Sequence, residues 1–168
     1  MKDSTSFKVG DMIVKFGEVC QIIRIEKRKN DDGNAEEFLY YKPYYAGQQV
    51  NEVTYSISVK NLSLASIRKP ISKKELLDLI KILSKTIEVD VPINIIEYKE
   101  AFNSNDPHEI AYTLKRIWVE KQEEADGISK SKNELYKASM KILVEEVALL
   151  KETTIPEAER IIEKALKN

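Results

Sequence analysis

The chain has 168 residues, with 27 Lys and Arg against 28 Asp and Glu, one His and one Cys. Apolar residues make up 42% and charged residues 33%, which is typical of a globular protein and excludes a disordered or fibrous one. The net charge of −1 gives no global attraction to nucleic acid or to an anionic membrane. A single cysteine excludes an intramolecular disulfide and a cysteine-rich zinc site, and it fits a reducing compartment.

The N-terminus leads into no apolar segment of the kind that signal peptides carry. No stretch of the sequence approaches the roughly 18 apolar residues that a membrane-spanning helix needs. We therefore expect a cytoplasmic protein that makes no membrane contact.

Hydropathy alternates with a period of two through the first part of the chain, which predicts short half-buried strands. In one of these strands the pattern places Val19, Ile23 and Ile25 on the same face. An Asp-Gly pair at residues 32–33 predicts the turn of a polar hairpin. The expected strands cover residues 11–16, 18–26, 38–41 and 53–59, and a loop follows the third of them at residues 42–52.

From Ser72 onward the hydropathy pattern becomes helical, and capping signals mark where helices begin. The expected helices run from Ser72 through Leu83, from Pro92 to about Asn103, from Pro107 to near Gly127, from Lys130 to Lys151, and from Thr154 onward. The sequence therefore predicts an α+β protein, with a small antiparallel β barrel in residues 1–70 and a compact domain of about five helices in residues 71–168.

Charge divides at the same boundary. Residues 1–70 hold 11 Lys and Arg against 9 Asp and Glu, whereas residues 71–168 hold 16 against 19. A helical domain with a net charge of −3 is a poor general phosphate binder, because phosphate binding by counterion release needs clustered cations. Any contact of this domain with nucleic acid must depend on a local patch.

The sequence offers little catalytic equipment, and we expect no enzyme, no cofactor and no metal site. The five glycines are isolated, so no glycine-rich phosphate loop is present. We interpret Cys20 as a buried core residue, His108 as an exposed neighbour of a helix cap, and Trp118 as a core residue. The acidic group of Glu123, Glu124 and Asp126 could bind a hard cation, but a solvated helix face is the favoured interpretation.

Two features remain as possible binding surfaces. The run Lys27-Arg28-Lys29 places a basic patch at the start of the polar hairpin. The strand expected at residues 53–59, which contains Tyr55, could lie at a sheet edge and pair with a strand of another protein. The sequence does not identify which edge of the sheet is free.

Several short motifs resemble, in order and spacing, those of CarD-like bacterial transcription regulators, whose first module also occurs in transcription-repair coupling factor. The N-terminal motifs are Phe7-Lys-Val-Gly-Asp11 and the strand that ends at Ile25-Glu26. Further motifs are Ser58-Val-Lys-Asn61, the run from Ile67 into Ile71-Ser-Lys-Lys-Glu-Leu76, Leu114-Lys-Arg-Ile-Trp118, and Ile142-Leu-Val-Glu-Glu-Val-Ala148.

The resemblance implies a Tudor-like β domain that binds the RNA polymerase β subunit, partly by strand-to-strand contact. It also implies a helical domain that reaches upstream promoter DNA, where a tryptophan acts as a wedge in the minor groove and stabilises the open complex. The family's two basic polymerase-binding positions fall on Arg28 and Ser56, and we expect Lys27 and Tyr55 to contribute beside them.

The resemblance also shows where this sequence departs from the family. The family's turn after the first strand is replaced by Lys15-Phe16-Gly17. The region 90–98 has no tryptophan, so Val91, Ile93 or Asn94 could stand in its place. Trp118 matches a different tryptophan, which the resemblance places in the helical core. We therefore expect weaker DNA contact than is typical for the family.

The remaining cations of the helical domain define the candidate DNA-binding set. They lie near the expected second helix, along the third, and at the start of the fourth. They are Lys99, Lys115, Arg116, Lys121, Lys130 and Lys132. They form a phosphate site if these turns adjoin in space, and scattered solubilising lysines are the alternative.

The function expected from these observations is that of a monomeric bacterial regulator that binds the polymerase β subunit and modulates open-complex stability. Its contact with promoter DNA should be weak and should depend on the polymerase. The alternative is a protein-only adaptor that captures another partner by edge-strand pairing and never touches DNA.

Overall fold

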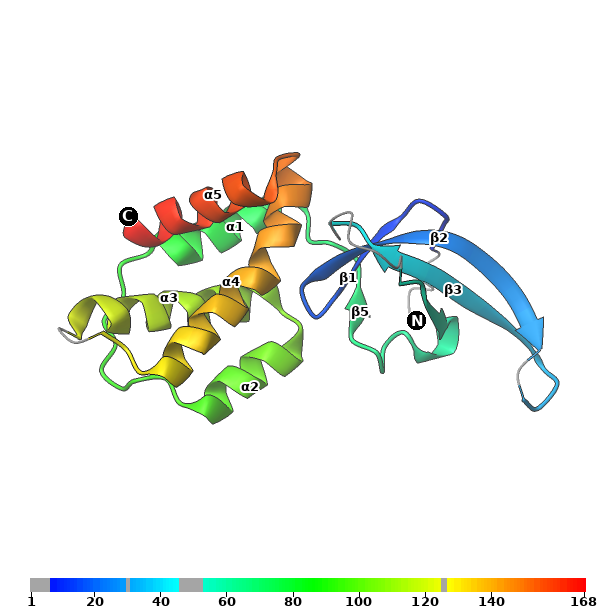
Figure 1. The fold of residues 1–168 in the computed structure, drawn as a ribbon, viewed down its shortest axis with the longest axis horizontal. Coiled ribbons are helices and arrows are strands. Elements are labelled where there is room, and N and C mark those ends of the chain that lie inside the picture. The colour runs from blue at the N-terminus through cyan, green and yellow to red at the C-terminus, as the bar shows by residue number, and fades with distance from the viewer. Residues whose placement is uncertain (1–6, 30, 46–52, 125–126) are drawn as a thin grey trace. The chain divides into compact units, whose positions relative to one another are not determined.

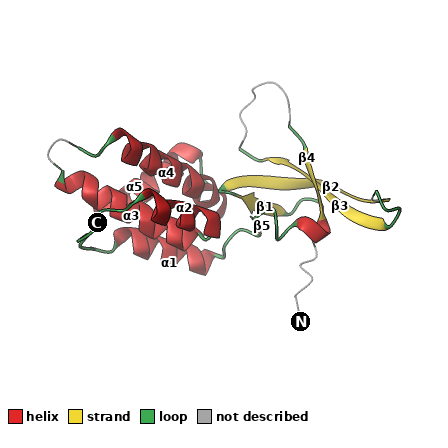
Figure 2. Ribbon diagram, turned by 90° about the horizontal axis from the view of Figure 1, so that it is seen from below, coloured by secondary structure: helices red, strands yellow, loops and turns green. Residues whose placement is uncertain are grey.

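The computed structural model describes residues 7–29, 31–45, 53–124 and 127–168. The chain divides into two compact units, residues 1–70 and 71–168, which we call the sheet unit and the helical unit. The expected α+β fold is confirmed: a curled antiparallel sheet is followed by five helices (Figures 1 and 2). Gly47 of the expected 42–52 loop and Asp126 of the acidic group lie outside the described residues.

The sheet of the described residues has five strands in the order β4-β3-β2-β1-β5. They are β1 (Met12–Lys15), β2 (Glu18–Lys29), β3 (Ala35–Pro43), β4 (Tyr55–Ser58) and β5 (Ile67–Arg68). Strands β2 and β3 form a long curved hairpin (Figure 1). Its arms extend beyond the expected residues, because polar positions continue the backbone pairing as far as Lys29 opposite Ala35.

A β-bulge in β2 corrects the expected distribution of side chains. The register shifts between Ile22 and Arg24, so that Ile23 is the extra residue and is exposed. Beyond the bulge, Ile25 pairs with Leu39 and packs against the core, so it does not share a face with Ile23. A bulge reverses the alternation of faces, and the hydropathy pattern alone did not reveal it.

One face of the sheet forms the core of the unit. Its buried cluster is Ile13, Cys20, Ile22, Leu39 and Tyr41, with Tyr55 and Ile57 of β4 packed against it. The expected burial of Cys20 is therefore confirmed.

The helical unit consists of α1 (Lys73–Ser84), α2 (Ile95–Ser104), α3 (Pro107–Glu123), α4 (Lys130–Lys151) and α5 (Ile155–Lys167). Complete capping boxes begin α1 at Ser72 and α5 at Thr154, as the sequence predicts. The expected start of α2 at Pro92 is wrong. The Asn94 side chain accepts hydrogen bonds from the backbone N–H groups of Ile96 and Glu97, so the helix begins three residues later.

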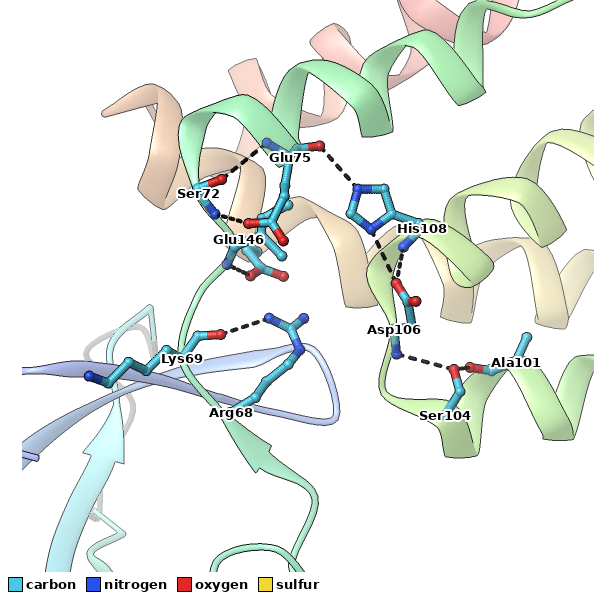
Figure 3. Close-up of polar contacts among 10 residues, drawn as sticks. Arg68, Lys69, Ser72, Glu75, Ala101, Ser104, Asp106, His108 and Glu146 are labelled. Carbon is cyan, nitrogen blue, oxygen red and sulfur yellow. Dashed lines mark hydrogen bonds and ion pairs between the residues drawn. The ribbon is translucent and has the colours of Figure 1, made fainter. Parts of the chain in front are cut away.

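His108 connects α1 with the first turn of α3, as Figure 3 shows. Its Nε2 lies 3.1 Å from the carbonyl oxygen of Glu75, and its Nδ1 lies 3.2 Å from Oδ1 of Asp106. In the same view, the carboxylate of Glu146 accepts a hydrogen bond of 2.8 Å from the backbone N–H of Ile71. His108 is thus a partly buried bridge and not the exposed neighbour of a cap that the sequence suggested.

Apolar side chains from α1, α3, α4 and α5 fill the helical core. They include Leu76, Leu79, Leu83, Ile110, Leu114, Ile117, Leu143, Val147, Ile162 and Leu166. Trp118 is only half-buried beside this core. Within the described residues, no helix has the length and apolar character to cross a membrane.

Candidate functional site

The face of the sheet opposite the core carries a row of charged and aromatic side chains. Directly paired residues of antiparallel strands share a face, and the register aligns Arg24, Tyr40 and Ser56 across β2, β3 and β4. The next aligned positions are Glu26, Phe38 and Ser58, followed by Arg28 opposite Glu36. We call the surface formed by Arg24, Glu26, Arg28, Phe38, Tyr40 and Ser56 the arginine face.

The two arginines of this face lie over aromatic rings. The guanidinium carbon of Arg24 is 4.0 Å from the centre of the Tyr40 ring, and that of Arg28 is 4.8 Å from the same centre. Arg28 also lies 5.3 Å from the centre of the Phe38 ring. Stacking of this kind orients a guanidinium without consuming its N–H donors, so the arginines remain able to bind an anion.

The carboxylate of Glu26 forms ion pairs with both arginines. Glu26 lies 3.2 Å from Arg24 and 3.5 Å from Arg28, and the two arginine side chains are 56% and 48% exposed. Exposed ion pairs of this kind contribute little stability and exchange readily for other partners. The local group of two guanidinium ions and one carboxylate therefore carries one excess positive charge.

The predicted polymerase-binding residues separate onto two faces. Arg28 and Ser56 both lie on the arginine face, and both are exposed. Lys27 pairs with Glu37 on the opposite face, where it is exposed beyond the core. Tyr55 also lies on that opposite face, where its ring stacks on Tyr41 with 5.5 Å between centres.

Strand β4 is the last strand at one side of the described sheet. Its pairing with β3 covers Tyr55 to Ser58, which uses one edge of the strand. The other edge is a row of backbone donors and acceptors that a further strand could use. Ser56 belongs to this strand, so the arginine face extends to this edge of the sheet.

Three of the six candidate DNA-binding cations have partners inside the helical unit. Lys115 is only 2% exposed, and its Nζ donates a hydrogen bond of 2.9 Å to the carbonyl oxygen of Leu166 on α5. Burial lowers the pKa of the Lys115 ammonium group, because the charged form is poorly solvated there. A side chain in this position cannot reach phosphate, so Lys115 is removed from the candidate set.

Arg116 and Lys132 are tied to partners inside the unit. Arg116 donates to Glu97 at 3.0 Å and to the carbonyl oxygen of Val91 at 2.9 Å. Lys132 forms an ion pair with Glu120, whose carboxylate is almost completely buried. Both cations hold the segment before α2 in place, and neither is free for a phosphate.

Glu120 is a central residue of the unit that the sequence analysis missed. Its second oxygen accepts a hydrogen bond of 2.6 Å from the backbone N–H of Ile93. Glu120 follows Ile117 by three residues, so it continues the apolar stripe of α3. A carboxylate on such a stripe is a signal of a buried partner, and it could have identified this residue.

The exposed cations of the predicted set are Lys99 on α2, Lys121 on α3 and Lys130 at the start of α4. The Nζ of Lys121 lies 5.0 Å from the centre of the Tyr136 ring, and this contact leaves its hydrogen-bond donors available. These three lysines are the members of the predicted set that a phosphate could reach.

The structure also separates the three possible counterparts of the wedge tryptophan. Ile93 is buried, and Asn94 is occupied as the N-cap of α2. Val91 is 67% exposed, and Ile95 and Ile96 are exposed aliphatic side chains at the start of the same helix. Of the three, Val91 alone presents an apolar group at the surface.

Among the described residues, no group of three or more His, Cys, Asp and Glu side chains is arranged to hold a metal ion. Glu123 and Glu124 are exposed at the end of α3.

The comparisons with known proteins bear on the helical unit. Residues 91–163 match the family model described as CarD, C-terminal domain, and the match extends from the segment before α2 into α5. No curated protein matches the chain. The family match agrees with the resemblance seen in the order of the sequence motifs, and it supports a CarD-like family assignment for the chain.

Proposed function

We propose that this protein is a bacterial transcription regulator that binds the RNA polymerase β subunit through its sheet unit and modulates the stability of the promoter open complex. The observation that carries the proposal is the position of Arg28 and Ser56. These are the two residues that the family resemblance relates to polymerase binding, and they lie on one exposed face, Ser56 on the edge strand β4 and Arg28 on β2.

A partner strand that pairs with β4 would combine two kinds of contact. Backbone hydrogen bonds along the free edge supply affinity, and side chains on alternate positions supply specificity. The exposed guanidinium of Arg28 adds a charge-assisted hydrogen bond at little cost, because it is already oriented over Phe38 and Tyr40.

The helical unit has a smaller part in this proposal. Val91 is the exposed apolar residue among the three possible counterparts of the wedge tryptophan, exposed aliphatic side chains follow it at the start of α2, and Lys99 lies on that helix. An aliphatic wedge at a base step can offset the few kcal/mol that unstacking costs, but it presents less surface than an indole. The protein would then bias the equilibrium between closed and open promoters only when the polymerase brings it to the DNA.

Co-purification of the full chain with the polymerase β subunit tests the proposal. We expect a stable complex with the wild-type protein. A folded protein that fails to retain the β subunit would contradict the proposed function.

The alternative is a protein-only adaptor in which the helical unit never contacts DNA. The internal engagement of Lys115, Arg116 and Lys132 favours it. Promoter footprinting in the presence of polymerase separates the two functions. Protection upstream of the melted region that depends on Val91 supports the regulator, and its absence supports the adaptor.

A further inference from the structure

A hollow of about 550 Å³ lies on the arginine face beside β4. It is lined by Ile23, Arg24, Tyr40, Thr54 and Ser56. The β-bulge forms one wall, because it displaces Ile23 from the regular alternation and leaves Arg24 directly opposite Tyr40. The family resemblance assigns no role to Arg24 or Tyr40.

Tyr40, one of the residues that line this hollow, has an unused hydrogen-bond donor. Tyr40 is only 5% exposed, and its hydroxyl group has no hydrogen-bond partner among the described residues. A buried polar group without a partner costs roughly 1–3 kcal/mol, so native proteins rarely retain one without a reason. A ligand atom that accepts a hydrogen bond would remove this cost.

Access to the hydroxyl group depends on the arginine side chains above the ring. The guanidinium groups of Arg24 and Arg28 lie over Tyr40, and about half of each side chain is exposed. Both are held by the single carboxylate of Glu26. An incoming anion can therefore draw Arg24 away from Glu26 and gain contact with the hydroxyl group beneath.

The chemistry of the lining selects a carboxylate. One guanidinium, one phenol and the hydroxyl groups of Thr54 and Ser56 offer donors to a planar anion, and Arg24 can bind a carboxylate through two parallel hydrogen bonds. Ile23 contributes an apolar wall that suits the methylene groups of a glutamate side chain. A nucleic-acid backbone is disfavoured, because the sheet unit has a net charge of only +2 and the hollow contains a single cation.

The place of the hollow indicates where that carboxylate comes from. Ser56 of the edge strand β4 lies next to Tyr40, so the hollow opens beside the free edge. Neighbouring strands lie about 4.8 Å apart, and alternate side chains of an added strand would point over this face. We propose that the hollow receives the carboxylate of an acidic side chain, from a partner strand that pairs with β4. The proposal rests on the proposed function only for the identity of the partner as RNA polymerase.

A titration with sodium acetate tests the hollow without any polymerase. In ¹H–¹⁵N spectra of the full chain, acetate should shift the signals of Arg24, Tyr40, Thr54 and Ser56, whereas sodium chloride at the same ionic strength should not. Tyr40→Phe, which removes only the hydroxyl group, and Arg24→Gln should each weaken acetate binding about tenfold. Lys8→Gln removes one exposed positive charge elsewhere in the unit and should leave the binding unchanged.

Acetate shifts that are absent, or that survive in both pocket variants, would overturn the proposal. Inorganic phosphate or a short DNA duplex that binds the same residues more tightly than acetate would also overturn it, in favour of a nucleic-acid site.

A second measurement uses the polymerase β subunit and separates this proposal from the proposed function. If the β subunit binds the wild type and if Tyr40→Phe and Arg24→Gln weaken this binding, the proposed function and the carboxylate pocket both stand. If it binds equally to both variants, no carboxylate of the β subunit enters the hollow, which overturns the proposed source of the carboxylate, and the function stands. Acetate binding without β-subunit binding supports the pocket and contradicts the proposed partner.

Discussion

The positive charges of the sheet unit and those of the helical unit are used differently. In the sheet unit, Arg24 and Arg28 share one exposed carboxylate and remain half exposed over aromatic rings. In the helical unit, Lys115, Arg116 and Lys132 each have a partner within the fold. The comparison shows that the charge available for binding depends on whether each cation is paired inside the fold or at the surface. The net charge of a unit is a poorer guide.

The different pairing of the cations in the two units indicates which unit docks first. A surface whose arginines are oriented but weakly paired is suited to a protein partner, because those pairs can be exchanged. Of the predicted DNA-binding set, only Lys99, Lys121 and Lys130 are exposed, and three cations suffice only for weak contact with phosphate. Docking led by the sheet unit is the order of events that this distribution favours.

The largest expected effect comes from breaking the internal ion pair of the helical unit. Glu120→Ala should lower the free energy of unfolding by about 3 kcal/mol, because it leaves Lys132 and the N–H of Ile93 without their acceptor. Glu120→Gln keeps an acceptor for Ile93 and should cost less. Urea unfolding measures both, with the exposed Lys130→Gln as a control expected to change stability by less than about 0.5 kcal/mol. Equal stability of Glu120→Ala and the wild type would show that the pair does not hold the unit together.

Charge reversal on the sheet unit should act on binding and leave folding unchanged. Arg28→Glu should weaken the complex with the polymerase β subunit by about 1.5–3 kcal/mol, because it replaces a charge-assisted contact with repulsion. Titration calorimetry measures the affinity, and Lys8→Glu provides the same change of charge at an exposed residue that is not part of the arginine face. An affinity that Arg28→Glu leaves intact removes Arg28 from the interface.

The starts of most helices could be predicted from the sequence, because capping signals are local. Ser72, Asp106 and Thr154 each cap the helix that their sequence context predicts. The start of α2 was predicted three residues too early, because a proline such as Pro92 is typical of a first helical turn. The residue that caps the helix is Asn94, which is a less conspicuous signal in the sequence. Local patterns thus predict an element well but its first residue less well.

The candidate sites were predicted less completely, because their geometry depends on register and burial. That Arg28 and Ser56 share a face follows from pairing across three strands, and the bulge at Ile23 brings Arg24 into the same face. No sequence period reveals a bulge. Lys115 likewise has no local signal of burial, since its partner is a carbonyl oxygen 51 residues away on α5.

A salt titration sharpens the contrast among the helical lysines. If Lys121 contacts DNA, Lys121→Gln should reduce the slope of log affinity against log salt by about 1, because one fewer counterion is released. Lys132→Gln should leave the slope unchanged, because that lysine is paired with Glu120. Fluorescence anisotropy with a promoter duplex measures both variants. A slope that falls equally in the two would mean that internal pairing does not withhold Lys132 from DNA.

The smallest expected effect concerns Lys115 and the dependence of stability on alkaline pH. Burial lowers the pKa of this ammonium group in the folded state below its usual value of 10.5, so between the two values the unfolded chain binds more protons. The contribution of Lys115 to the free energy of unfolding should therefore rise with pH across this window. Lys115→Met replaces the lysine with an uncharged side chain of similar length, so its stability should not show this rise with pH.

The measurement must be a difference in unfolding free energy between the wild type and Lys115→Met, because two partly buried tyrosines act in the opposite direction. Burial raises the pKa of Tyr98 and Tyr136, so their contribution to stability is lost as pH increases through their folded-state values. The wild type and Lys115→Met both retain these tyrosines. Subtracting the urea-unfolding free energies of the two proteins at pH 8, 9 and 10 therefore removes the loss of stability that the tyrosines cause in both. A difference that stays constant with pH would mean that burial does not lower the pKa of Lys115. The buried cation of the helical unit would then be no harder to keep charged than the exposed arginines of the arginine face.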